Sequence, residues 1–232
     1  MRAQCSASKM SQPVQPIIYL ITTGATNDRT TPSSKEFVDV LKVVAAAVAA
    51  KVSLIQLREK RLSARVLFEL TVQAAQITRK TETRLLVNDR ADIAHAAEAD
   101  GVHLSTRSLE ADVIRRTFGP NFLIGVSTHS IEEARAARDD ADFAVFGPVF
   151  ETDSKAVYGP PQGVTKLAEV ARELAPFPII ALGGVGLENL AECYKAGVSG
   201  IAGIGIYNHR ETLSDIVHMI RELFQGASLN DF

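Results

Sequence analysis

The sequence has little cysteine and no long apolar run, and each shortage excludes a class of protein. Only two of its 232 residues are cysteine, Cys5 and Cys193, so no disulfide framework is expected. No apolar run approaches the roughly 20 residues that span a bilayer. Residues 1–16 are polar and lack the apolar stretch of a secretory signal. We therefore expect a cytoplasmic protein that does not interact with a membrane.

An excess of charge of one sign is also missing. The chain has 25 Lys and Arg against 27 Asp and Glu, a formal net charge of −2. Because a nucleic-acid binder normally carries a basic face, this balance argues against nucleic acid as a partner. Apolar types make up 46% of the residues and charged types 22%, as in ordinary globular proteins. The length is sufficient to bury a large core without metal or disulfide crosslinks.

Two kinds of segment alternate from Ile17 onward. Short β-branched apolar runs predict buried strands, and nearly continuous apolar character suits parallel strands covered on both faces. These runs are at 17–21, 52–57, 84–87, 101–104, 122–126, 143–147, 178–182 and 200–204. Between them lie longer stretches rich in Ala, Leu, Glu and Arg with helical spacing. Ser63 and Ser130 precede two of these stretches at positions typical of helix N-caps.

The strict order of strand and helix predicts a parallel sheet with crossover helices. Eight such units in about 210 residues fit a closed (β/α)8 barrel, the TIM barrel. An open doubly wound sheet is the alternative, but its usual G-x-G-x-x-G pattern is missing after Ile21. We expect one barrel domain over 17–225, a flexible N-terminal tail over 1–16 and a C-terminal tail over 226–232.

Residues that follow the strands matter most, because barrel enzymes carry their chemistry at the carboxyl ends of the strands. Arg58 and Lys60 follow the second expected strand, and Lys155 follows the sixth. Arginine offers a rigid fork for phosphate oxygens and lysine a compact charge. Gly183-Gly184 and Gly205 follow the last two strands, where backbone N–H groups commonly bind phosphate. The pattern predicts a phosphorylated, anionic substrate.

Several polar residues have a structural interpretation beside the functional one. Asn88-Asp89 could simply cap the helix that follows. His103 alternates with apolar neighbours, which favours a packed barrel residue over a catalytic one. His129 lies past a strand end, and whether it touches substrate stays open. Cys193 is expected to be inert, and no His, Cys and Glu cluster has zinc spacing.

Six motifs occur in order, one per strand end. They are QLREK at 56–60, VNDR at 87–90, DGVHL at 100–104, IGVSTHS at 124–130, GPVFETDSK at 147–155 and ALGGV at 181–185. With them the chain resembles the superfamily of thiamine phosphate synthases and their sister branch, the TenI-type thiazole tautomerases. The resemblance extends from about Ile17 to Phe224.

For the synthase branch, the resemblance implies a Mg²⁺-dependent transferase of thiamine biosynthesis. The ring nitrogen of a hydroxyethylthiazole phosphate attacks the methylene carbon of a hydroxymethylpyrimidine diphosphate, and pyrophosphate leaves. The residues that would hold the pyrimidine diphosphate are Gln56, Arg58, Lys60 and Asn88. Asp89 would bind the metal, Lys155 would stabilise the departing diphosphate, and Ser127 would contact the pyrimidine or its leaving group. The thiazole phosphate would be bound by Thr152, Ser154, Gly184, Ile204 and Gly205.

One departure from the synthase pattern weakens the expected metal site. Synthases normally continue Gly-Gln-x-Asp after DGVHL, whereas this chain has Ser105 to Ser108, so that Ser108 replaces the second carboxylate. Mg²⁺ is often coordinated by one or two carboxylates together with substrate phosphates, so the replacement by Ser108 does not exclude a magnesium site. Arg107 could partly substitute by holding the diphosphate.

The tautomerase branch needs no metal. The segment FETDSK at 150–155 resembles the tautomerase form more than the usual synthase form. A histidine suits the proton transfer that aromatises a thiazole carboxylate phosphate, and His129 would take that role. That branch has little reason to keep Gln56, Lys60 and Asp89 together, so we favour the synthase. A non-catalytic, ligand-binding or regulatory barrel is the third interpretation. The resemblance is also compatible with a homodimer.

Overall fold

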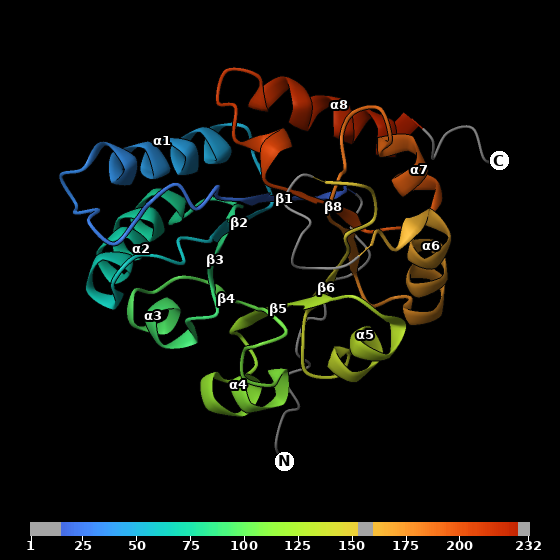
Figure 1. Cartoon of the computed structure of the whole chain (residues 1–232), viewed down its shortest axis with the longest axis horizontal. Coiled ribbons are helices and arrows are strands. Elements are labelled where there is room, and N and C mark those ends of the chain that lie inside the picture. The colour runs from blue at the N-terminus through green and yellow to red at the C-terminus, as the bar shows by residue number, and fades with distance from the viewer. Residues whose placement is uncertain (1–14, 153–159, 227–232) are drawn as a thin grey trace, which may run out of the picture.

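The computed structural model describes residues 15–152 and 160–226 and confirms the closed parallel barrel (Figure 1). Its strands are β1 (Ile17–Ile21), β2 (Leu54–Leu57), β3 (Arg84–Asn88), β4 (Gly101–Leu104), β5 (Leu123–Thr128), β6 (Phe143–Phe146), β7 (Ile179–Ala181) and β8 (Gly200–Gly203). Its helices are α1 (Lys35–Ala49), α2 (Ala64–Thr78), α3 (Ala91–Ala96), α4 (Ala111–Phe118), α5 (Ile131–Ala137), α6 (Gly163–Leu174), α7 (Leu190–Lys195) and α8 (Leu213–Gly226), with the short 3-10 helix η2 (Gly205–Tyr207) after β8. The helices surround the strands as an outer layer.

The barrel closes because β1 pairs in parallel with both β2 and β8. Tyr19 lies opposite Leu54 on one side and Ala202 on the other. All the carboxyl ends of the strands therefore meet at one rim, which is the end that positions the site.

The core has two layers because successive side chains of a strand face opposite ways. Within β1, Ile18 and Leu20 pack outward against helices, with Phe37 of α1 in the same cluster. The inward-facing cluster fills the barrel interior. Its buried members are Ile17, Tyr19, Ile21, Leu54, Leu86, Phe143, Val145, Ile180 and Ala202. This filled interior is a packed core, and the ligand sites of such barrels lie at the rim.

The structure corrects several expected strand boundaries, and three of the changes affect the site. Strand β3 includes Asn88, one residue beyond its expected end. Strand β2 begins at Leu54, two residues later than expected. Strand β5 runs on to Thr128, because Ser127 and Thr128 pair with Val145 and Phe146 of β6. Ser127 is therefore fixed inside the sheet and does not belong to the loop after it.

The expected helix starts are confirmed at both serines. The Ser63 hydroxyl accepts the N–H of Val66 at 3.3 Å, and that of Ser130 accepts the N–H of Glu133 at 3.2 Å. Within the described ranges, no helix combines the length and the apolar character needed to cross a membrane.

Candidate functional site

A chain of hydrogen bonds crosses the rim from β2 to the end of β3. The Gln56 amide nitrogen donates to Asn88 Oδ1 at 2.8 Å, and the Asn88 amide nitrogen donates to Asp89 Oδ2 at 2.6 Å. Gln56 is only 2% exposed. Because the Asn88 amide accepts from Gln56 and donates to Asp89, it aligns the three side chains with one another.

Asp89 ends this chain in an unusual backbone conformation. Its φ is +60°, and its N–H donates to the carbonyl of His103 at 2.9 Å. Its Oδ1 accepts the Ser105 N–H at 2.9 Å and also the hydroxyl of Ser108. Burial alone would raise the pKa of Asp89, but the hydrogen bonds from Ser108, Ser105 and Asn88 outweigh it and leave the pKa below its ordinary value of 3.8. The carboxylate is therefore ionised at neutral pH.

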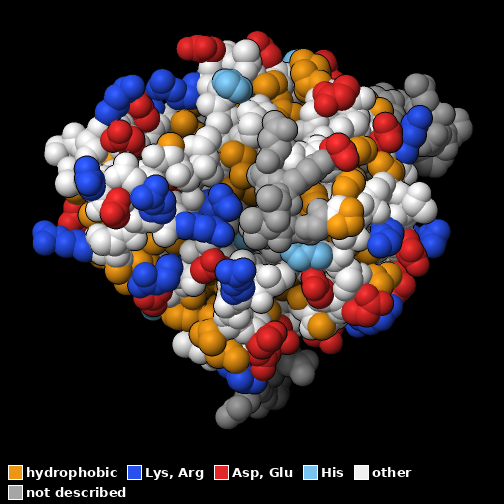
Figure 2. Space-filling view, in the orientation of Figure 1, with side chains coloured by type: hydrophobic (Ala, Val, Ile, Leu, Met, Phe, Trp, Pro, Cys, Tyr) orange, Lys and Arg blue, Asp and Glu red, His pale blue; other side chains and the backbone are white. Residues whose placement is uncertain are grey.

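The two described cations predicted for the site follow directly after β2. Arg58 is half-buried and Lys60 is exposed, with the buried Glu59 between them. Figure 2 shows Lys and Arg side chains gathered over β2 and β3 on this face of the molecule. The rim at β2 and β3 therefore brings Lys and Arg side chains beside the ionised carboxylate of Asp89.

The glycine pair after β7 lies where the loop after β6 approaches most closely. Gly183 and Gly184 have φ values of +93° and +67°, and a Cβ on Gly184 would lie 2.2 Å from the carbonyl oxygen of Glu151. The N–H of Phe150 donates to the Gly183 carbonyl at 2.9 Å. Only glycine meets both requirements at position 184. Gly205 begins η2, where a Cβ would find open space, and the half-buried Ile204 precedes it.

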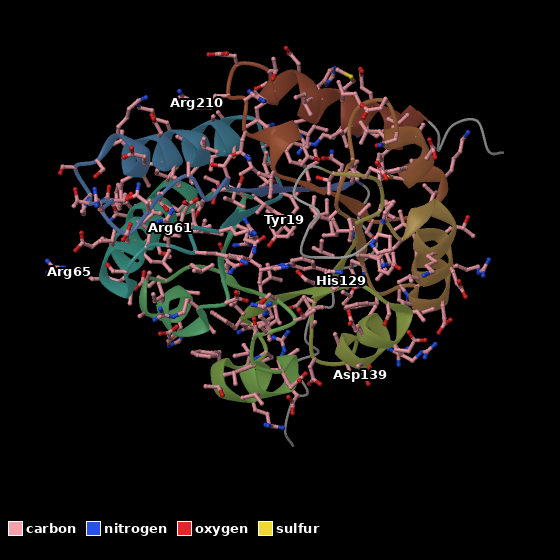
Figure 3. The ribbon with its side chains drawn as sticks, viewed as in Figure 1. Tyr19, Arg61, Arg65, His129, Asp139 and Arg210 are labelled. Atoms are coloured by element: carbon pink, nitrogen blue, oxygen red, sulfur yellow. The ribbon has the colours of Figure 1, made fainter. Side chains whose placement is uncertain are left out.

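His129 lies at the β5–β6 side of the rim (Figure 3). Its Nδ1 hydrogen-bonds to the carbonyl oxygen of Gly147, and its main-chain N–H donates to Glu133 at 2.6 Å. Thr152 follows on the loop after β6 and is half-buried. The predicted site residues Ser154 and Lys155 lie outside the described residues.

His103 joins the site in a way that the sequence did not reveal. It is 3% exposed, as expected of a packed barrel residue, but its Nε2 lies 2.9 Å from the Ser127 hydroxyl. Burial lowers its pKa to about 4, so the ring is neutral. Its Nδ1 and the Tyr19 hydroxyl are buried polar atoms without a hydrogen-bond partner. Figure 3 places Tyr19 near the barrel axis.

The signal that could have placed His103 is a glycine on the neighbouring strand. His103 lies opposite Gly125 in the β4–β5 register. A Cβ on Gly125 would be 2.9 Å from His103 Nδ1, so the glycine makes room for the ring. Strand register is a tertiary property, and the sequence alone does not state it.

Asp89 is the acidic side chain of the hydrogen-bonded chain and the available carboxylate for a metal there. No group of three or more His, Cys, Asp and Glu residues in the described part of the chain could hold a metal ion.

Comparison with known proteins identifies the family of this chain. A family model described as thiamine monophosphate synthase matches residues 18–206. A putative thiamine-phosphate synthase of Geobacter sulfurreducens is 47% identical over 165 residues, covering 71% of this chain and 77% of the relative. The thiamine-phosphate synthase of Roseiflexus castenholzii is 39% identical over 189 residues, covering 81% and 79%.

A solved structure has the same fold at appreciable identity. Thiamine phosphate pyrophosphorylase from Pyrococcus furiosus superposes with a TM-score of 0.74 at 28% identity, covering 90% of this chain and 95% of that one. The family predicted from the ordered motifs is confirmed. This chain belongs to the thiamine monophosphate synthase family.

Proposed function

We propose that this protein is a thiamine-phosphate synthase that joins hydroxymethylpyrimidine diphosphate to hydroxyethylthiazole phosphate and releases pyrophosphate. The observation that carries the proposal is the ionised Asp89, aligned through Asn88 with Gln56, at the rim that also bears Arg58 and Lys60. A departing diphosphate needs cations near its oxygens, and an ionised carboxylate at the same rim can hold a divalent cation there. The relatives described above carry the synthase name.

The reaction needs little acid–base catalysis from the protein. The thiazole nitrogen uses its own lone pair to form a C–N bond to the pyrimidine methylene carbon. The C–O bond to the diphosphate breaks, and pyrophosphate leaves with that electron pair. Because negative charge develops on the leaving group, Arg58 and Lys60 stabilise the transition state more than the ground state. Lys155 has the same predicted role from the loop after β6.

The remaining predicted contacts divide between the two substrates. Gln56 and Ser127 face the pyrimidine side, and the neutral His103 holds the Ser127 hydroxyl in place. The thiazole phosphate lies against the glycine loops after β7 and β8, whose backbone N–H groups can approach an anion closely. Gly183, Gly184, Ile204 and Gly205 belong to these loops, with Thr152 and Ser154 predicted to complete them.

Mg²⁺ fits Asp89 as a single-carboxylate ligand. The low pKa keeps this carboxylate charged, and Mg²⁺ commonly combines one or two carboxylates with substrate phosphates and waters. When bound, the ion neutralises charge on the diphosphate oxygens. Ser108 occupies the expected place of a second acid and hydrogen-bonds to Asp89. The diphosphate therefore has to supply much of the coordination.

An assay with both phosphorylated substrates and Mg²⁺ tests the proposal. We expect thiamine phosphate and pyrophosphate in equal amounts, and loss of both products when EDTA is present. His129→Ala should retain this activity, because the synthase step needs no proton shuttle at that position. Aromatisation of a thiazole carboxylate phosphate that disappears in His129→Ala would instead favour the tautomerase. Binding of the phosphorylated ligands without formation of either product would favour the third interpretation, a non-catalytic regulatory barrel.

Replacing Ser108 by Asp should increase affinity for Mg²⁺ about tenfold or more when pyrophosphate is present. The new carboxylate would lie against Asp89, and a divalent cation relieves the repulsion between two like charges. Calorimetric titration of Mg²⁺ into the pyrophosphate complex measures the change, with Ser108→Asn as the uncharged control. Equal Mg²⁺ affinity in wild type and Ser108→Asp would contradict this placement of the metal.

A further inference from the structure

Glu59 is a buried carboxylate located between the two cations of the rim. It is 2% exposed, while Arg58 before it is half-buried and Lys60 after it is exposed. An acidic side chain is rarely buried this completely unless it is paired. A carboxylate in that position needs a reason, because it lowers the positive charge of the rim.

Both carboxylate oxygens of Glu59 are held by the loop that follows β1. Oε1 accepts the Thr22 hydroxyl at 2.6 Å and the Gly24 N–H at 3.3 Å. Oε2 accepts the Thr26 hydroxyl at 2.6 Å and the Thr26 N–H at 3.3 Å. The β1–α1 loop is therefore fastened to the segment after β2 by four hydrogen bonds, all of which the Glu59 side chain accepts.

The same contacts reach the backbone of Arg58. Its N–H donates to the Thr22 hydroxyl oxygen at 2.9 Å, while that hydroxyl donates to Glu59. A Cβ on Gly24, whose φ is +72°, would lie 3.2 Å from the Arg58 carbonyl oxygen and 3.9 Å from its guanidinium. The loop thus packs directly on Arg58, and Thr22 relays the position of Glu59 to it.

We propose that Glu59 is a positioning residue that fastens the β1–α1 loop to the segment after β2 and thereby holds Arg58 ready for a diphosphate. Because the loop occupies both carboxylate oxygens of Glu59, this side chain acts through its neighbours. This inference rests on the proposed function, in which Arg58 and Lys60 bind the diphosphate. Its physical basis is that a cation already held in place loses little conformational freedom when the anion binds.

The test measures affinity for inorganic pyrophosphate in the presence of Mg²⁺ by calorimetry. Glu59→Gln keeps the shape but replaces one of the two acceptor oxygens by an NH2 donor, so the N–H of either Gly24 or Thr26 loses its acceptor. We therefore expect binding to weaken roughly tenfold to 100-fold. Thr26→Val removes one donor and should weaken binding in the same direction by less. Glu69→Gln, on the exposed face of α2, is the matched control and should bind as wild type does.

A double-mutant cycle separates positioning from a general loss of structure. In an Arg58→Ala/Lys60→Ala background, adding Glu59→Gln should weaken pyrophosphate binding no further. Hydrogen exchange at the Gly24 and Thr26 amides should become faster in Glu59→Gln, while exchange in β4 and β5 stays unchanged.

The outcomes distinguish this inference from the proposed function. A folded Glu59→Gln variant that binds pyrophosphate within twofold of wild type, while Arg58→Ala/Lys60→Ala binds poorly, overturns the role of Glu59 and leaves the diphosphate site intact. Wild-type affinity in Arg58→Ala/Lys60→Ala overturns the diphosphate site itself, and the role of Glu59 with it. Equal weakening by Glu59→Gln with and without the two cations also overturns positioning.

Discussion

Replacing Asp89 by Asn should lower kcat/KM for thiamine phosphate formation by about 100-fold or more, which corresponds to roughly 2.7 kcal/mol of transition-state stabilisation. The variant keeps the size of the side chain and an oxygen for the Ser105 N–H and the Ser108 hydroxyl. It loses the charge that binds Mg²⁺, and its amide meets the Asn88 amide that now donates to Asp89. Initial rates of thiamine phosphate and pyrophosphate formation at substrate concentrations well below KM measure the effect.

Asp92→Asn is the matched control for this variant. Asp92 lies in the first turn of α3, three residues further along, and is paired with Arg90 at 2.6 Å. The substitution removes the same charge near the same rim but outside the chain of hydrogen bonds, so activity should stay within about threefold. Comparable losses in Asp89→Asn and Asp92→Asn would mean that general electrostatics, and not a specific ligand at Asp89, governs the rate.

The second large effect concerns stability in acid. The buried His103 has a pKa of about 4 against an ordinary value of 6.5, so the unfolded chain binds a proton over a range in which the folded protein does not. The stability that comes from burying His103 in its neutral form is complete above pH 6.5 and is lost as the pH falls toward 4. The loss amounts to about 3 kcal/mol of unfolding free energy, since one pKa unit is 1.36 kcal/mol.

Urea unfolding at a series of pH values between 7 and 4 measures this loss. His103→Gln should lower stability at pH 7 but flatten the decline between pH 6.5 and 4, because glutamine does not titrate. His218→Gln on α8, where the side chain is 74% exposed, should leave the decline as it is in wild type. A decline of the same steepness in His103→Gln and wild type would show that other groups cause it.

The fold was predictable because its signals are local and repeated. Alternating apolar runs and amphipathic stretches identify strands and helices one unit at a time, and eight units in order leave few topologies. The serine caps at Ser63 and Ser130 were also readable, since a cap needs only the next three residues. The errors lie at strand ends such as Thr128, where pairing with the neighbouring strand decides how far the strand continues.

The candidate site was predictable only in outline. Strand ends of a barrel converge, so Gln56, Arg58, Lys60 and Asp89 could be placed at one rim from their order alone. Their roles stay predictions. The sequence did not indicate that His103 touches Ser127, because that contact depends on the β4–β5 register and on the space left by Gly125.

The sequence by itself determined the family, the barrel and the residues at its rim, because motifs and periodicity are written along the chain. The tertiary structure decided which of these groups meet. It brought Ser108 onto Asp89 and the β1–α1 loop onto Glu59, across 19 and as many as 37 residues of chain. Burial and hydrogen bonding between distant segments set the charge state of Asp89 and the neutrality of His103, and these depend on three-dimensional neighbours that no sequence window contains.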